Sequence, residues 1–166
     1  MNDLVLVNFG TPAFKPLGSD EMERLSPSKS MTLQLVPYTF ETYSPEKIDV
    51  SRMREWHFKI EDVVIGQLVG TLQTSSRLYI NMFQIHPDLM FKGFGKVCIS
   101  LFLKSNPQFS VLCGVSTHDD EFSAVDFWTR CGATFKRCCC CQRQTCDSIC
   151  LDDGCHFYLS NPALPK

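Results

Sequence analysis

The chain has 166 residues, 44% of them hydrophobic and 20% charged, which is the composition of an ordinary globular protein. A net charge of −2 gives no electrostatic basis for binding nucleic acid or a membrane surface, and no apolar run is long enough to span a bilayer. We therefore expect one domain over residues 1–166, with neither nucleic acid nor membrane as a partner. The N-terminus lacks the features of a signal peptide, which predicts a cytoplasmic location.

Ten cysteines are many for a chain of this length. Cys98, Cys113 and Cys131 have apolar neighbours and are predicted to be small buried hydrophobic residues. The other seven fall in a cysteine-rich insert at about 138–155. Without a secretion signal, reduced thiols or a metal site are favoured there over a disulfide framework.

The N-terminal third mixes short apolar runs with prolines. Residues 4–9 are predicted to form a strand, and residues 19–25 a short helix capped by Ser19 or Asp20. Residues 32–50 are predicted to be irregular, with short strands.

The clearest β pattern follows. Residues 53–60, 62–72 and 78–85 each read as a strand, with breaks at 61–62 and 74–76. The pattern predicts an antiparallel meander of three strands.

A glycine loop, Lys92-Gly-Phe-Gly-Lys96, follows the third of these strands and leads into an apolar helix at about 94–104. A helix N-terminus offers unpaired N–H groups and partial positive charge, and glycine lets a phosphate approach the backbone. The loop therefore fits an anion cradle, and on these residues alone a plain strand-to-helix turn fits it too.

The second half continues with a buried strand at 109–116 and a helix from Ala124 to Gly132. Asp119 or Asp120 is a candidate cap for that helix, and Gly132 would end it. Residues 134–137 and 156–159 are predicted to pair as a hairpin around the cysteine-rich insert.

Three motifs in this order carry a resemblance to one known protein family. Phe83-Gln-Ile-His-Pro87 is similar to the family's L-x-V-x-P strand end. Met90-Phe-Lys-Gly-Phe-Gly95 is similar to the (Arg/Gln)-x-x-Gly-x-(Gly/Ala) loop that holds the coenzyme A pyrophosphate. Ala124-x-x-Phe-Trp-x-x-x-Gly132 is similar to the helix beside the thioester. In all three motifs the chain resembles the GNAT N-acetyltransferase superfamily, and the resemblance covers about residues 53–137.

The resemblance implies a mixed α/β (α+β) fold. Its central sheet would be mostly antiparallel and flanked by helices, with two parallel middle strands, 78–85 and 110–116, that splay apart. It also implies an acetyl-CoA-dependent N-acetyltransferase that transfers the acetyl group directly to an amine of a protein or small molecule. The alternative is a catalytically degenerate module that acts by binding acyl-CoA or a protein partner.

Site residues also follow from the resemblance. The pantetheine arm would pair with the backbone near Phe83 and Ile85, and the pyrophosphate would meet the glycine loop. The implied acyl-CoA residues are Phe83, Ile85, Phe91, Lys92, Gly93, Phe94, Gly95, Lys96, Phe127 and Trp128.

The implied catalytic machinery departs from the family pattern. Met90 replaces the usual Arg or Gln, and Trp128 replaces a frequent Tyr whose hydroxyl can protonate the leaving thiolate. Glu121 stands where Asn is common. His118, beside acidic residues, is the candidate base, with Glu121 as a second candidate; a solvated capping turn is the alternative for this segment.

The cysteine-rich insert admits a metal site. Cys141, Cys146, Cys150 and Cys155 could hold zinc in a tetrahedron, although the insert lacks two separated C-x₂-C pairs. Reduced thiols packed in a strand pair and disulfides are the other two states that the sequence leaves open.

Overall fold

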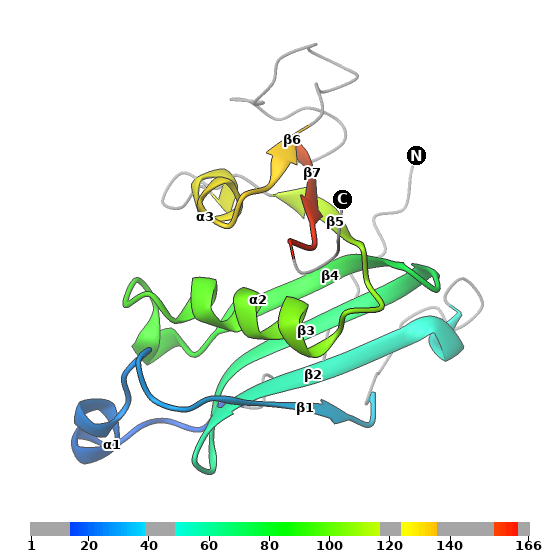
Figure 1. Cartoon of the computed structure of the whole chain (residues 1–166). Helices are drawn as coiled ribbons and strands as arrows, with labels where there is room; N and C mark the ends of the chain where they lie inside the picture. The colour runs from blue at the N-terminus through cyan, green and yellow to red at the C-terminus, as the bar shows by residue number, and fades with distance from the viewer. Residues whose placement is uncertain (1–13, 39–48, 117–123, 136–154, 163–166) are drawn as a thin grey trace, which may run out of the picture.

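The computed structural model describes residues 14–38, 49–116, 124–135 and 155–162 (Figure 1). The strand predicted at 4–9 therefore lies outside the described residues. Within them a seven-stranded sheet has the order β1-β2-β3-β4-β5-β7-β6. The strands are β1 (Thr32–Val36), β2 (Met53–Ile60), β3 (Val63–Thr74), β4 (Arg77–Ile85), β5 (Val111–Ser116), β6 (Thr134–Phe135) and β7 (Cys155–Ser160).

The predicted meander is confirmed, since β2 pairs antiparallel with β3 and β3 with β4. Strand β1 extends it by pairing with β2, so part of the segment expected to be irregular is a regular strand. The predicted final hairpin is confirmed too, because β6 and β7 pair antiparallel. Strand β7 also pairs with β5, which the sequence did not indicate.

The parallel pair at the centre of the sheet is β4 and β5. Their pairing runs from Arg77–Val111 to Ile80–Gly114 and stops there, although β4 continues to Ile85. The mixed, mostly antiparallel sheet with parallel middle strands is confirmed.

Two helices cover one face of this sheet. Helix α2 (Phe94–Ser105) lies across the middle strands and α3 (Ala124–Arg130) lies beside β5 and β7 (Figure 1). The core forms where their apolar residues meet every second residue of the strands, because alternate strand side chains point to one face. Its fully buried members include Phe58, Leu78, Phe102, Leu112 and Phe157.

Short helices complete the described chain. Helix α1 spans Ser19–Arg24, and its N-cap is Gly18. The prediction that Ser19 or Asp20 caps this helix is therefore wrong. The Glu21 side chain accepts a hydrogen bond from the Gly18 N–H at 2.9 Å. The 3-10 turns η2 (Val50–Arg52) and η3 (Pro87–Leu89) precede β2 and follow β4. No helix among the described residues is long and apolar enough to cross a membrane, and the cytoplasmic location stays a prediction.

Candidate acyl-CoA site

The glycine loop places a bare helix N-terminus at the surface. Helix α2 begins after Gly93, which as N-cap supplies no side-chain hydrogen bond, and its first turn contains no acidic residue. Lys92 and Lys96 are both exposed beside this end. Since the dipole of a helix disfavours cations at its N-terminus, this arrangement suits an anion that neutralises both the lysines and the free N–H groups.

The backbone of the loop has a positive φ on either side of Lys92. Gly93 has a φ of +89°, which costs glycine little, but Phe91 has a φ of +61° and its side chain is 82% exposed. A left-handed conformation at a non-glycine residue costs about 1–2 kcal/mol. Such strain often persists where function requires a particular backbone course.

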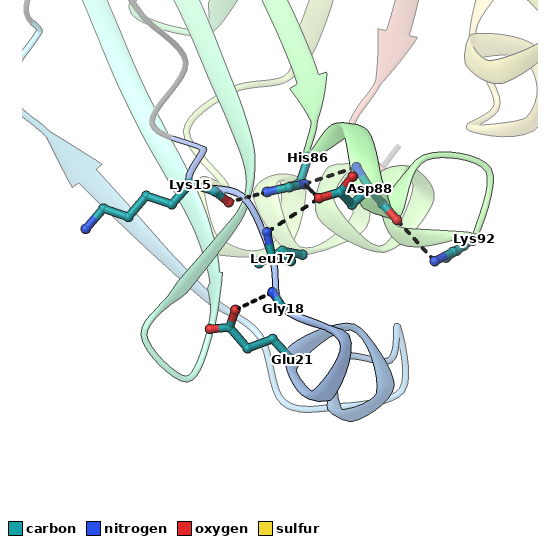
Figure 2. Close-up of polar contacts among 7 residues, drawn as sticks. All are labelled: Lys15, Leu17, Gly18, Glu21, His86, Asp88 and Lys92. Atoms are coloured by element: carbon teal, nitrogen blue, oxygen red, sulfur yellow. Dashed lines mark hydrogen bonds and ion pairs between the residues drawn. The ribbon is translucent and has the colours of Figure 1, made fainter.

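The loop is anchored from behind by His86 (Figure 2). The His86 Nε2–H donates to the Lys15 carbonyl at 2.7 Å, and Nδ1 accepts from the Asp88 N–H at 3.1 Å, so the buried ring is a neutral tautomer. The Lys92 ammonium donates to the Asp88 carbonyl at 3.1 Å. These contacts fix the start of the loop to the segment before α1, and His86 therefore has a structural role.

Beyond the half that pairs with β5, one backbone edge of β4 is free of pairing with any strand that the structure describes. A bulge at Asn81 separates the halves: Ile80 pairs with Gly70 and Met82 with Val69, so Asn81 has no residue opposite. Before the bulge the side chains of Leu78 and Ile80 point to the core. The extra residue shifts the alternation of side chains by one position, so that after it Phe83 and Ile85 point to the core. On the β5 side, residues 81–85 have no strand partner among the described residues.

Aromatic rings fill the corner between this edge, α2 and α3. Phe127 stacks on Phe83 with centroids 5.6 Å apart, and Trp128 stacks on Phe157 at 4.1 Å. Gly95 lies directly against Phe127: a Cβ at residue 95 would come within 2.8 Å of the ring. Close packing of α2 on α3 thus requires glycine at this position, whatever the loop binds.

Several solved structures with a similar fold are acetyltransferases. A Bacillus subtilis acetyltransferase in complex with CoA matches at a TM-score of 0.53 with 17% identity, over 79% of this chain and 99% of that one. An IAA acetyltransferase from Bacillus cereus matches at 0.51 with 16% identity, over 79% and 99%. Tetrahymena GCN5 matches at 0.50 with 13% identity, over 69% and 71%. No family model matches the sequence, and a search of curated proteins finds no match.

The chain has the GNAT fold. At these identities the likeness extends to the fold alone, and the site must be judged on its own residues.

Several features of this GNAT-fold site fit acyl-CoA. The basic, uncapped α2 N-terminus suits a pyrophosphate, and the free β4 edge suits the amides of a pantetheine arm. At the end of β5, the hydroxyl of Ser116 is buried and has no hydrogen-bond partner within the described part of the chain. Ser116 lies on the same face of the strand as Leu112 and Gly114. A buried polar group without a partner is costly, which supports a polar ligand there.

One feature opposes a simple fit. The Phe127 ring bridges Phe83 on β4 and Gly95 on α2, and so closes the corner that separates the free strand edge from the helix N-terminus. Phe127 must turn away for a chain to run from the loop along β4.

The sequence-predicted binding residues are brought together around this corner. Phe83 and Ile85 lie on the free half of β4, residues 91–96 form the loop and first turn of α2, and Phe127 and Trp128 line the corner from α3. The candidate catalytic residues His118 and Glu121 lie outside the described residues. Trp128 is 5% exposed and packed among rings, which gives it a place in the core.

The metal prediction is not tested by the structure. Cys141, Cys146 and Cys150 lie outside the described residues, and Cys155 begins β7. Within the described residues no group of three or more His, Cys, Asp or Glu side chains could hold a metal. Zinc in the cysteine-rich insert stays a prediction.

Sequence reasoning missed a polar cluster on the second face of the sheet, opposite the helices. The cluster consists of Glu55 and His57 on β2 and Gln67 on β3. The Oε1 atom of Glu55 accepts from Gln67 Nε2 at 2.6 Å and lies 2.8 Å from His57 Nε2. The signal was present as Glu and His two apart in a predicted strand, which places both on one face.

A shallow hollow of about 240 Å³ lies elsewhere, lined by Leu35, Trp56 and Phe109 among others. It opens beside Asn106, at the opposite end of α2 from Gly93. We do not assign the acyl-CoA site to it.

Proposed function

We propose that this protein is an N-acyltransferase that moves an acetyl group from acetyl-CoA to an amine of a protein or small molecule. The observation that carries the proposal is the uncapped, basic N-terminus of α2 beside the unpaired half of β4, in a fold whose similar structures are acetyltransferases. The Bacillus subtilis structure of the same fold was solved with CoA, which supports the same ligand here.

In this proposal the loop and the strand edge divide the work of binding. The backbone N–H groups from Phe91 to Lys96, with the two lysines, hold the pyrophosphate, and the backbone at Phe83 and Ile85 pairs with the pantetheine amides. Holding the thioester against a fixed strand edge orients it for attack, and such positioning supplies much of the rate in a two-substrate reaction. Bound acetyl-CoA supplies the activated acyl group.

The proton donor for the leaving thiolate is not Trp128 in this proposal. An indole N–H donates a hydrogen bond but does not ionise near neutral pH, and this indole is buried among rings. Water admitted to the corner protonates the thiolate instead. His118 remains our candidate base, and zinc in the cysteine-rich insert remains a separate proposal for that segment.

A second function is favoured by the same aromatic corner. Phe127 packed between Phe83 and Gly95 is what a module that no longer carries out transfer would have, since a closed corner improves packing where no ligand enters. Such a protein would bind acyl-CoA without transfer, or bind only a protein partner.

Thermal unfolding with acetyl-CoA tests the proposal. A ligand that binds only the folded state raises the melting temperature with its concentration, by free energies of about 2.7 kcal/mol at a hundred times Kd. A Lys96→Glu protein is the decisive variant, because an acidic residue in the first turn favours the helix while it opposes a phosphate. Its melting temperature without ligand should hold or rise, and its affinity for acetyl-CoA should fall about tenfold.

The matched control is Lys104→Glu in the last turn of the same helix. It has the same charge change but should leave the acetyl-CoA shift intact. An equal loss in both variants, or no shift of the unaltered protein at millimolar acetyl-CoA, would contradict acyl-CoA binding. Release of free thiol with a panel of amines then separates the enzyme from the binding module.

A further inference from the structure

The polar cluster of Glu55, His57 and Gln67 contains two hydrogen-bond acceptors besides the carboxylate, Gln67 Oε1 and, in a neutral ring, His57 Nδ1. A carboxylate accepts only, so the Gln67 atom that lies 2.6 Å from it must be the amide nitrogen, which directs Gln67 Oε1 away from Glu55. For the same reason His57 donates from Nε2 to Glu55, and in a ring that carries a single proton Nδ1 is then an acceptor.

One of these acceptors is buried without a partner. Gln67 is 5% exposed, and its Oε1 atom has no hydrogen-bond partner. A buried acceptor without a partner destabilises the folded state. A ligand that donates a hydrogen bond to Gln67 Oε1 would remove this cost.

The cluster lies in a row that crosses the sheet toward the free half of β4. His57 is directly opposite Gln67, and Gln67 is directly opposite Gln84 of β4. Neighbouring strands are about 4.8 Å apart, so the cluster lies roughly 5–10 Å from the unpaired edge of β4. The cluster and the helices lie on opposite faces, because Trp56 and Leu68, which alternate with these residues, belong to the core under α2.

The charge of the cluster selects the ligand. Glu55 supplies a carboxylate, and Gln67 Oε1 and, in a neutral ring, His57 Nδ1 are acceptors. Burial, and then the charge of Glu55, raises the pKa of nearby Tyr38 to about 12, so its phenol adds no charge. The side chain of His57 is 14% exposed and provides the cluster's contact with solvent.

We propose that Glu55, His57 and Gln67 form a binding site for a primary ammonium group, whose three N–H donors match one carboxylate and two neutral acceptors. As the place where the amine substrate is received, this site rests on the proposed N-acyltransferase function. Such a site implies a cationic substrate, which approaches the sheet from the face opposite α2 and α3.

Titration of the whole protein with n-butylammonium chloride, followed by NMR of the histidine rings, tests the site. The His57 signal is identified by its loss in a His57→Gln protein. The signal should shift saturably with n-butylammonium and hardly at all with 1-butanol or butyrate. Both control compounds have the same number of carbon atoms as n-butylammonium, but 1-butanol is uncharged and butyrate is negatively charged. Glu55→Gln keeps the shape and removes the charge, and should weaken binding at least about tenfold.

Glu61→Gln is the matched control, because Glu61 is an exposed carboxylate at the turn between β2 and β3. It should leave n-butylammonium binding unchanged. Gln67→Met provides a second variant should Glu55→Gln fold poorly: it removes the unpaired Oε1 atom and should also weaken binding. Equal shifts with 1-butanol, or binding unchanged in both Glu55→Gln and Gln67→Met, would overturn the ammonium site.

The acetyl-CoA thermal shift separates this inference from the proposed function. Retained acetyl-CoA binding with no response of His57 to n-butylammonium overturns the ammonium site alone. If the His57 signal shifts specifically with n-butylammonium but acetyl-CoA does not change the melting temperature, the ammonium site is supported and the proposed acyltransferase function is contradicted.

Discussion

The two faces of the central sheet are built from the same strands but differ in composition, one apolar and one polar. The face under α2 and α3 carries Trp56, Phe58, Leu68, Leu78 and Leu112, all nearly fully buried and apolar. The opposite face carries Glu55, His57, Gln67, Thr71 and Asn81, joined by hydrogen bonds. The two faces are separated only by the alternation of side chains along each strand. We expect substitutions on the first face to change the stability of the fold, and substitutions on the second face to change both stability and ligand binding.

The largest effect is expected on the helix-covered face. Phe102 is fully buried, stacks with Phe109 at 6.1 Å and meets Trp56 edge-on at 4.9 Å. Phe102→Ala should lower the free energy of unfolding by about 3–5 kcal/mol, because it leaves a cavity among these rings. Urea denaturation measures the loss.

Leu35→Ala is the control for Phe102→Ala, since Leu35 on the edge strand β1 is 58% exposed. It should change the free energy of unfolding by less than about 0.5 kcal/mol. Comparable losses in the two proteins would contradict the difference in burial between Phe102 and Leu35.

A smaller stability effect is expected on the second face. Glu55→Ala removes the partner of both Gln67 Nε2 and His57 Nε2 and should cost about 1–3 kcal/mol, because buried donors are left unpaired. Glu61→Ala removes an exposed carboxylate 3.5 Å from Arg24 and should cost less than about 1 kcal/mol. If Glu55→Ala unfolds no more easily than Glu61→Ala, the polar cluster contributes nothing to the fold.

Gly95 and Phe127 test where the first face meets the acyl-CoA site. Gly95→Ala places a methyl group within 2.8 Å of the Phe127 ring and should cost about 1–3 kcal/mol through overpacking. In a Phe127→Leu background the same change should cost clearly less, a coupling that a double-mutant cycle measures. Additive losses would show that Gly95 is constrained by something other than this ring.

Phe127→Leu by itself tests whether the Phe127 ring obstructs the binding of acetyl-CoA. The smaller side chain should open the corner and strengthen acetyl-CoA binding if the ring obstructs the path along β4. An acetyl-CoA shift that is absent before and after the substitution would favour the module without acyl-CoA.

The sequence predicted those elements whose patterns are local. The meander from 53 to 85 and the helix after Gly93 follow from alternation, helical periodicity and one glycine, and the structure confirms both. Three features of the fold and site did not follow. The bulge at Asn81 shifts the alternation by one residue, the insertion of β7 between β5 and β6 depends on long-range pairing, and the Gly95–Phe127 contact joins two helices.

The candidate site divides in the same way. The glycine loop was predicted because a helix N-terminus has a local signature, but the cluster of Glu55, His57 and Gln67 forms across two strands in a register set by a bulge near Phe58. Without that register Gln67 could not be placed opposite His57. Strand residues that work together across a sheet are therefore harder to predict than a loop that works through its own backbone.

The smallest effect is expected at the cysteines under the helices. Burial raises the pKa of the Cys98 thiol to about 12, and burial raises that of Cys131 to about 11 even though Lys96 lowers it. At pH 8 the ionised fraction of Cys98 is about one in ten thousand, and only the thiolate reacts with iodoacetamide. Both residues should stay unlabelled in the native protein and react in urea, as peptide mass spectrometry would show. Because the folded pKa values are raised, ionisation favours the unfolded chain only from about pH 9 upward, so stability at neutral pH is unaffected. Rapid native labelling of Cys98 at pH 8 would mean that α2 leaves the sheet far more readily than its packing implies.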